Sequence, residues 1–358
     1  MATETELRRA WCKESVLNFS RYMFRRREGV RYNVGDHIRR IATALDDVAR
    51  GACRRLIINI APRYGKTELV SKMFIAYGLA LNPRAQFLHL SYSDDLVLSN
   101  SRAINELLRA DYFRELFPET AVSTTNAKRW NTTAGGGVYA VSTAGQVTGF
   151  GAGRVAAEDE APAVLPGYVS GPPFNGAIVI DDPLKPTDAM SDLVREDVNF
   201  RFEHTIRSRV NDRATPIVII MQRLHEQDLC GYLTTHEPGV WRVLSLPCLT
   251  VDADGNERAL FEKKHTVAEL HELERVNPFV FETQYQQNPT PLEGLMYSGF
   301  AEYDTLPVGQ GVARNYTDTA DTGDDYLCSV CYVEFPTGLY VTDLLYTQRP
   351  MEYTEPET

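Results

Sequence analysis

The most constraining feature of this sequence is an apolar run that leads through a short turn into Gly-Lys-Thr and then a helical segment. Residues 55–60 are typical of a buried strand, and residues 67–81 of a helix that stops before Pro83. A loop between them would point successive backbone N–H groups and a helix N-terminus at one spot, an arrangement that binds phosphate. The residues of this candidate phosphate loop are Pro62, Arg63, Tyr64, Gly65, Lys66 and Thr67.

Two residues of the loop have distinct expected tasks. The Lys66 ammonium would reach the β- and γ-phosphate oxygens of a nucleotide, and the Thr67 hydroxyl would bind Mg²⁺. The first Gly that is usual in such loops is missing, because Ile60 stands at its position. The alternative interpretation is a Gly-Lys turn that merely precedes a helix, and the flanking strand and helix argue against it.

A second apolar run ends in two carboxylates. Residues 176–180 are followed by Asp181 and Asp182. A carboxylate at a strand end can hold Mg²⁺ and its neighbour can orient or deprotonate an attacking water, so we assign these roles to Asp181 and Asp182 respectively. The alternative is a buried strand that ends in an Asp-Pro turn. Gln222 ends a third β-rich run, where it either senses the γ-phosphate or is simply a polar residue at a strand end.

Strands that alternate with helices predict an α/β fold with a mostly parallel sheet flanked by helices. The second acid and an additional strand between the two motifs indicate a P-loop NTPase core of the type that carries its own catalytic acid. We expect residues 154–176, rich in Ala, Pro, Gly and acids, to form a mobile surface loop. The expected organisation is an N-terminal helical subdomain (1–50), an ATPase core (51–245), a helical linker region (246–310) and a β-rich segment (311–358).

The charge distribution limits the classes of partner. The net charge of −11 argues against bulk coating of nucleic acid. Residues 316–358 hold nine acids and one base, so the rest of the chain is nearly neutral with local basic stretches, each either a solvated helix face or a binding surface. One stretch is Arg21, Arg25, Arg26, Arg27 and Arg31, and the other is Arg195, Arg201, Arg207, Arg209 and Arg213.

Neither a membrane span nor a disulfide framework is indicated. No apolar run approaches the roughly 18 residues that a span requires, and no signal peptide is visible. The six cysteines are scattered, which favours a reducing, cytoplasmic setting. We therefore expect a cytoplasmic protein without a membrane partner.

Taken together, the motifs resemble those of the large terminase subunit of tailed bacteriophages, the ATP-driven DNA-packaging motor. The resemblance runs from about Asn33 to Asp343 and includes a deviant Walker A in which an Arg precedes Gly-Lys-Thr. The resembling segments are Pro62–Thr67, Ser91–Ser93, Val179–Lys185 (Walker B), Gln222–Gly231 (coupling segment), Phe281–Pro289 and Tyr316–Ala320 (the first strand of an RNase H-like nuclease).

The resemblance implies a subunit that hydrolyses ATP with Mg²⁺ and translocates double-stranded viral DNA into a procapsid. It implies a small terminase subunit, a portal protein and a homo-oligomeric ring as partners, in the host cytoplasm. An arginine supplied in trans would accelerate hydrolysis, with Arg154 as the candidate and Arg63 as the competing cis candidate. The family's Thr-Gly-Arg-Gly turn is replaced here by Thr148-Gly-Phe-Gly151, and Arg154 follows three residues later.

The same resemblance makes Asp318 the first metal-binding acid of the nuclease, which would use Mg²⁺ or Mn²⁺ to cut the genome. Asp321, Asp324 and Asp325 follow it in a turn. In the family the other essential acids come from elements further downstream. We therefore expect an incomplete RNase H-like domain, a truncated chain and no DNA cleavage.

Two other functions compete with this interpretation. A helicase-like or repair DNA translocase would share the ATPase core, but the helicase motifs expected after Gln222 are absent from the sequence. A non-catalytic scaffold would be expected to have lost Lys66, Thr67 or Asp181, and all three are intact.

Overall fold

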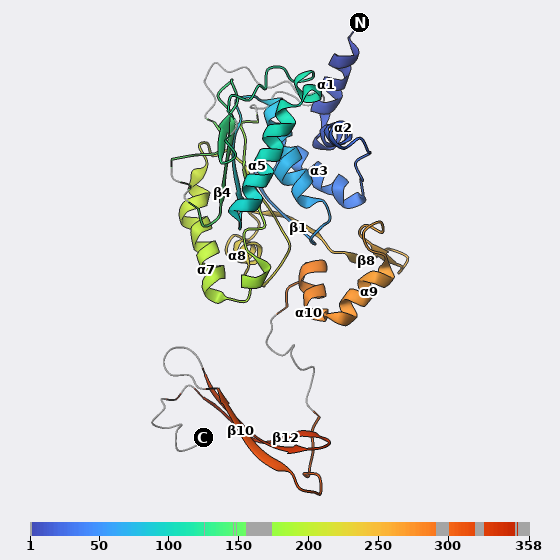
Figure 1. Cartoon of the computed structure of the whole chain (residues 1–358), viewed down its shortest axis with the longest axis vertical. Coiled ribbons are helices and arrows are strands. Elements are labelled where there is room, and N and C mark those ends of the chain that lie inside the picture. The colour runs from blue at the N-terminus through green and yellow to red at the C-terminus, as the bar shows by residue number, and fades with distance from the viewer. Residues whose placement is uncertain are drawn as a thin grey trace. The chain divides into compact units, whose positions relative to one another are not determined.

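The apolar runs of the sequence form a seven-stranded sheet in the computed structural model, which describes residues 2–124, 126–145, 147, 149–154, 174–290, 301–318, 326–347 and 349. The strands are β1 (Arg55–Ile60), β2 (Gln86–Ser91), β3 (Arg129–Asn131), β4 (Gly137–Ser142), β5 (Ile178–Asp181), β6 (Ile217–Met221) and β7 (Arg242–Leu246). They are ordered β3-β4-β2-β5-β6-β1-β7. Figure 1 shows this sheet with β1 and β4 labelled. The β3–β4 pair is antiparallel and the other five described pairs are parallel, which confirms the predicted α/β class.

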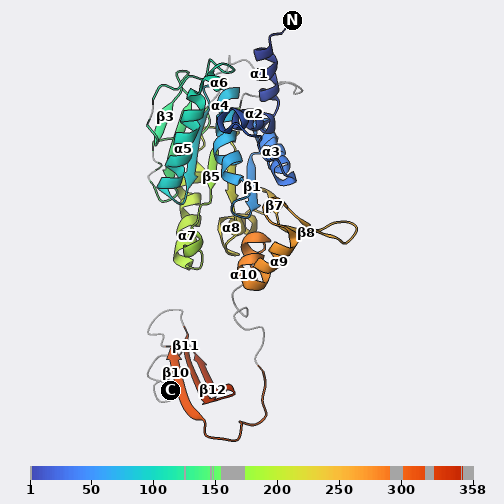
Figure 2. The ribbon, with the colours of Figure 1, turned by 45° about the vertical axis from the view of Figure 1, so that its right-hand side comes forward.

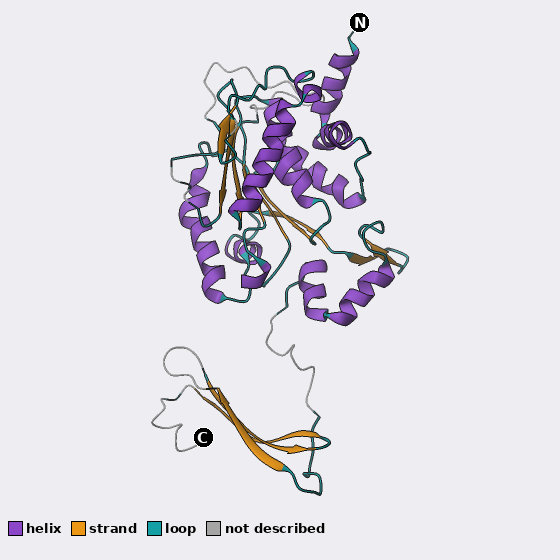
Figure 3. Cartoon of the chain, viewed as in Figure 1, coloured by secondary structure: helices purple, strands orange, loops and turns teal. Residues whose placement is uncertain are grey.

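Helices cover both faces of this sheet (Figure 3). The N-terminal segments are α1 (Glu4–Glu14), α2 (Val16–Glu28) and α3 (Asp36–Ala49); those that follow β1 and β2 are η1 (Thr67–Met73, π-helical), α4 (Phe74–Leu81), α5 (Asp94–Arg109) and α6 (Asp111–Arg114). Those that follow β5 and β6 are η2 (Pro186–Asp188), α7 (Asp192–Arg201), η3 (Phe202–Ile206), η4 (Arg207–Arg209) and α8 (Leu229–His236). The predicted helix over 193–210 is therefore divided into three pieces.

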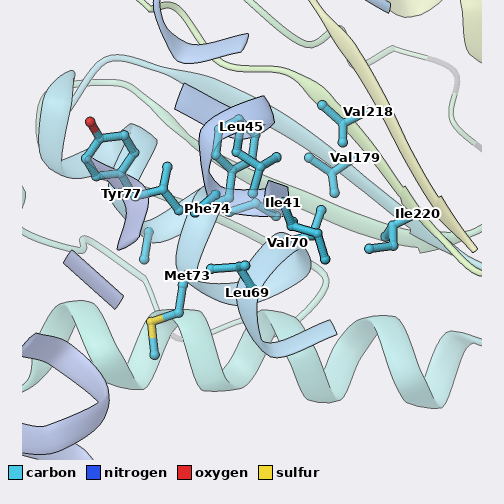
Figure 4. Close-up of a cluster of buried hydrophobic side chains, with 14 of the residues drawn as sticks. Ile41, Leu45, Leu69, Val70, Met73, Phe74, Tyr77, Val179, Val218 and Ile220 are labelled. Carbon is cyan, nitrogen blue, oxygen red and sulfur yellow. The ribbon is translucent and has the colours of Figure 1, made fainter. Parts of the chain in front are cut away.

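Alternate residues of each central strand enter two separate cores, because successive side chains of a strand point to opposite faces. On β1, Leu56 and Ile58 join the core beneath α2–α5, whereas Ile57 joins the core beneath η3 and α8. Figure 4 shows the first core, in which Val179, Val218 and Ile220 of the sheet face side chains of α3, η1 and α4. Burial on both sides holds the strand ends, and the residues just beyond them, in fixed positions.

The N-terminal helices begin and end at specific residues. Thr3 forms a capping box with Glu6, and the Ser15 side chain accepts a hydrogen bond from Asn18 N at the start of α2. Helix α2 ends at Gly29, whose φ of 74° is a left-handed conformation that glycine adopts without strain. These signals account for the helices predicted in residues 1–50.

A small helical segment follows β7 and completes the first of two compact units, Met1–Leu295 (Figure 2). It contains the hairpin β8 (Leu249–Val251) and β9 (Glu257–Ala259), then α9 (Val267–Val276), α10 (Pro278–Val280) and η5 (Phe281–Tyr285). Backbone hydrogen bonds from Cys248 N to Tyr285 O and from Leu260 N to Cys248 O close this segment on itself. None of the helices in the described ranges is long and apolar enough to cross a bilayer.

The second unit, Met296–Thr358, contains an antiparallel meander of β10 (Val312–Asp318), β11 (Leu327–Phe335) and β12 (Gly338–Thr347). The predicted β-rich segment is present, with β10 beginning four residues before Tyr316. Its RNase H-like character stays a prediction. Most of the predicted loop 154–176 lies outside the described residues, as do Asp321, Asp324 and Asp325.

Candidate nucleotide site

The loop after β1 adopts a backbone that only some residues tolerate. Gly65 has a φ of 80° and Arg63 a φ of 66°, so the chain turns through two left-handed residues before the helix begins at Thr67. Lys66 is already helical, and it precedes η1, a π-helical turn of the kind that often marks a functional site. Arg63 is exposed at the turn, whereas Lys66 is buried.

Lys66 reaches across to the carboxylate that follows β5. Its Nζ lies 2.6 Å from Asp182 Oδ1, and the side chains are 7% and 23% exposed. Asp182 has a φ of 45°, a strained conformation for an aspartate. Its backbone is held there by hydrogen bonds from Asp182 N to Ile220 O and from Tyr92 N to Asp182 O. The neighbouring strands therefore impose the position of this side chain.

Asp181 is buried beside this pair. Its Oδ2 accepts a hydrogen bond of 2.7 Å from the Ser71 hydroxyl, while its Oδ1 is buried and has no hydrogen-bond partner among the residues that the structure describes. Burial raises the pKa of Asp181, and Lys66 and the hydroxyls of Ser71 and Thr67 oppose that rise. Burial likewise raises the pKa of Asp182 against the opposing charge of Lys66, with the Asp181 charge adding to the rise.

These oxygens fit a magnesium ion. Mg²⁺ prefers carboxylate, hydroxyl and water oxygens together with phosphate oxygens. The site offers an unpartnered carboxylate oxygen on Asp181, with the Thr67 hydroxyl close enough to lower the pKa of that carboxyl. Two carboxylates face one ammonium, so the site favours an additional cation. The donor set and the local charge are thus compatible with the metal that the sequence analysis assigned here.

Gln222 follows β6, the strand that lies between β1 and β5. Its backbone N–H donates to Asp182 Oδ1 at 3.2 Å, and its side-chain Oε1 is buried without a hydrogen-bond partner in the described ranges. The structure therefore brings Gln222, Lys66 and Asp182 together. The next residue, Arg223, instead forms a buried ion pair with Asp228, the N-cap of α8.

Two predicted site residues lie elsewhere. Arg154 follows Gly153, whose N–H donates to Gln86 O at the amino end of β2. Asp181 instead pairs with Ser91 at the carboxyl end of β2, so the two residues lie at opposite ends of this strand. Asp318 is exposed at the end of β10 in the second unit. Within the described ranges, no group of three or more His, Cys, Asp or Glu is placed to hold a metal.

The structure adds two residues that the sequence analysis did not assign, Ser71 and Gln287, and it gives Tyr64 of the predicted phosphate loop a contact outside that loop. Ser71 lies one helical turn after Thr67, and this spacing was a usable signal. Tyr64 in the phosphate loop is buried, and its hydroxyl lies 2.9 Å from His265 Nδ1. The Gln287 side chain accepts a hydrogen bond from Arg223 N. Thus the segment after β7 contacts both the phosphate loop and the end of β6.

The chain is similar in structure to several solved proteins. It aligns with the large terminase of the thermophilic bacteriophage D6E at 10% identity and a TM-score of 0.46, covering 91% of this chain and 73% of that one. The large terminase of bacteriophage HK97 aligns at 14% identity and a TM-score of 0.44, covering 99% and 71%. Dbp5 of S. cerevisiae, in a complex that contains ADP, aligns at 13% identity and a TM-score of 0.38, covering 67% and 52%.

No protein-family model and no curated protein matches the sequence. At identities of 10–14% and TM-scores below 0.5, the structural likenesses assign no role to any residue of this chain.

Proposed function

We propose that this chain is an ATP-hydrolysing motor subunit of the large terminase kind, which moves double-stranded DNA into a viral procapsid. The observation that carries the ATPase part is the convergence of Lys66, Asp181 and Asp182 at the carboxyl ends of β1 and β5. The sequence motifs that resemble those of large terminases support the DNA-packaging part.

Lys66 and the phosphate loop bind the triphosphate. In the structure the Lys66 ammonium donates to Asp182 Oδ1 at 2.6 Å. A triphosphate in the loop offers this ammonium oxygens of higher charge, so Lys66 exchanges one anionic partner for another and does not become an unpaired buried cation. The left-handed turn at Arg63 and Gly65 brings backbone N–H groups toward the same phosphates.

Asp182 then orients and deprotonates the attacking water. When Lys66 turns to the phosphates, Asp182 loses its ion-pair partner but keeps the hydrogen bond from Gln222 N. Its raised pKa makes it a stronger base than an exposed aspartate. Gln222, whose backbone N–H donates to Asp182 Oδ1, is the candidate sensor of the γ-phosphate. Mg²⁺, held by Asp181 and Thr67, would neutralise charge on the phosphates.

ATP turnover in the presence of Mg²⁺ tests the site. We expect Lys66→Ala to lose most of its turnover while its circular dichroism spectrum and melting temperature show a folded protein. Lys128→Ala, which removes an exposed lysine next to β3, is the matched control and should keep wild-type turnover. Full activity in a folded Lys66→Ala protein would refute the assignment.

The motor part of the proposal requires partners. We propose a homo-oligomeric ring that docks on a portal protein and receives DNA from a small terminase subunit. Turnover should therefore rise when portal and small subunit are added. A helicase-like translocase would instead separate the strands of a duplex with a single-stranded tail, which a strand-displacement assay detects.

A further inference from the structure

The two basic stretches of the sequence differ in how far ion pairs neutralise them in the fold. In the second stretch Arg195 pairs with Asp192, Arg201 with Asp197, and Arg207 with Glu203 and Glu237, so these charges are mostly neutralised. In the first stretch, by contrast, Arg21, Arg25 and Arg31 have no ion-pair partner among the residues that the structure describes. The first stretch therefore keeps a net positive charge that no described acidic residue neutralises.

These three arginines line one pocket of about 600 Å³ together with Arg39 and Lys263. They come from α2, from the connection between α2 and α3, from α3, and from the turn before α9. No aspartate or glutamate is among the residues that line the pocket. Five cations from four separate segments thus converge on one hollow of the first unit.

The walls between the cations are aromatic. Trp11, Tyr22 and Tyr32 line the pocket, and the Arg21 guanidinium lies 6.0 Å from the Trp11 ring centroid. This contact holds the guanidinium against the wall without neutralising its charge.

We propose that this pocket binds the phosphate backbone of duplex DNA. Four of the five cations are arginines, whose planar guanidinium matches phosphate oxygens better than an ammonium does. The hollow is larger than one phosphate group requires, which fits a run of phosphates along a strand. The choice of DNA as the polyanion rests on the packaging function proposed above.

The charge of the whole chain makes a local site necessary. The protein carries −11 overall and repels DNA at long range, whereas residues 1–50 contain eleven Arg and Lys against seven Asp and Glu. An acidic protein segment could also be attracted to five cations. The predominance of arginine over lysine favours phosphate over carboxylate clusters, and an acidic peptide becomes an arm of the test.

The test measures the affinity of the full chain for a fluorescent DNA duplex by anisotropy across a salt series. Each lost phosphate contact reduces the slope of log affinity against log salt by about 0.9. We expect Arg21→Gln/Arg25→Gln to reduce that slope by about 1.8 and to weaken binding equally for unrelated DNA sequences. The matched control is Arg102→Gln/Arg109→Gln, which neutralises two exposed arginines on helix α5 and should keep the wild-type slope.

Three further measurements decide the proposal: ATP turnover without DNA, the salt slope of a lysine variant, and binding of poly-glutamate as the acidic peptide. ATP turnover without DNA should be unchanged in the Arg21/Arg25 variant, so a failure of the ATPase assignment is seen separately from a failure of the DNA site. Arg21→Lys/Arg25→Lys should restore most of the slope, because it restores the charge. A slope equal to that of the control variant, no duplex binding by the wild-type chain, or a loss of poly-glutamate binding with DNA binding intact would each overturn the proposal.

Discussion

Replacing Gly65 by Ala separates the role of the phosphate loop from its contribution to folding. Gly65 has a φ of 80°, and a Cβ built there would lie 3.5 Å from Ile38 Cδ1, an ordinary contact. The cost is therefore conformational and not steric, about 1–2 kcal/mol for an L-residue in the left-handed region. The loop can avoid this cost only by turning its N–H groups away from the phosphates.

Gly51 provides a matched control. It follows α3, has a φ of 79°, and has no atom within 4 Å of a built Cβ. We expect Gly51→Ala to lose about 1–2 kcal/mol in urea unfolding, and Gly65→Ala to lose less, because its loop relaxes by turning its N–H groups away from the phosphates. Only Gly65→Ala should raise the KM for ATP, by roughly 5- to 30-fold, since 1.4 kcal/mol corresponds to a factor of ten.

Steady-state ATP hydrolysis and urea unfolding of the two variants would test this reasoning. If Gly65→Ala kept both the wild-type KM and the wild-type stability, phosphate binding would not require the left-handed turn at Gly65. If Gly51→Ala raised the KM by the same factor, the effect would be a general consequence of destabilisation.

Three other changes test parts of the site. Tyr64→Phe removes a hydroxyl bonded at 2.9 Å to the segment after β7, and Tyr77→Phe removes one bonded at 2.9 Å to a backbone carbonyl; both should cost about 1 kcal/mol in urea unfolding, but only Tyr64→Phe should change kcat/KM. Because the pKa of Asp181 is raised in the fold, the wild type gains stability below the unfolded pKa and loses it as pH rises through the folded pKa. Asp181→Asn should therefore melt above the wild type at pH 8, with a difference that shrinks toward pH 4, and an unchanged difference across this range would count against a charged Asp181. Finally, Arg154→Ala subunits mixed with Asp182→Ala subunits should hydrolyse ATP faster than the two proteins measured separately, and mere additivity would exclude Arg154 as the trans arginine.

Parts of the fold could be predicted because their signals are local. The buried strand β6 is a continuous apolar run, β5 is one that ends in Asp181, and β1 is one that only Asn59 interrupts after Arg55. Helix α8 has its own start residue, the N-cap Asp228. Strand β7 has only one fully buried residue and β3 has three residues in all, so neither forms an apolar run that a reader would recognise. These strands form because β3 hydrogen-bonds to β4 and β7 hydrogen-bonds to β1. No local sequence pattern predicts this pairing.

The sequence by itself determined which residues could meet a phosphate and a metal, since the Gly-Lys-Thr turn and the two carboxylates each follow a recognisable strand. Only the tertiary structure decided that they meet. Lys66 and Asp182 are 116 residues apart, and their contact depends on the insertion of β6 between β1 and β5. The same holds for the pocket of Arg21, Arg39 and Lys263. Packing brings these side chains together, and no periodic pattern in the sequence predicts that they are neighbours. Strand order and helix packing are properties of the whole fold, so contacts that depend on them cannot be read from any one segment.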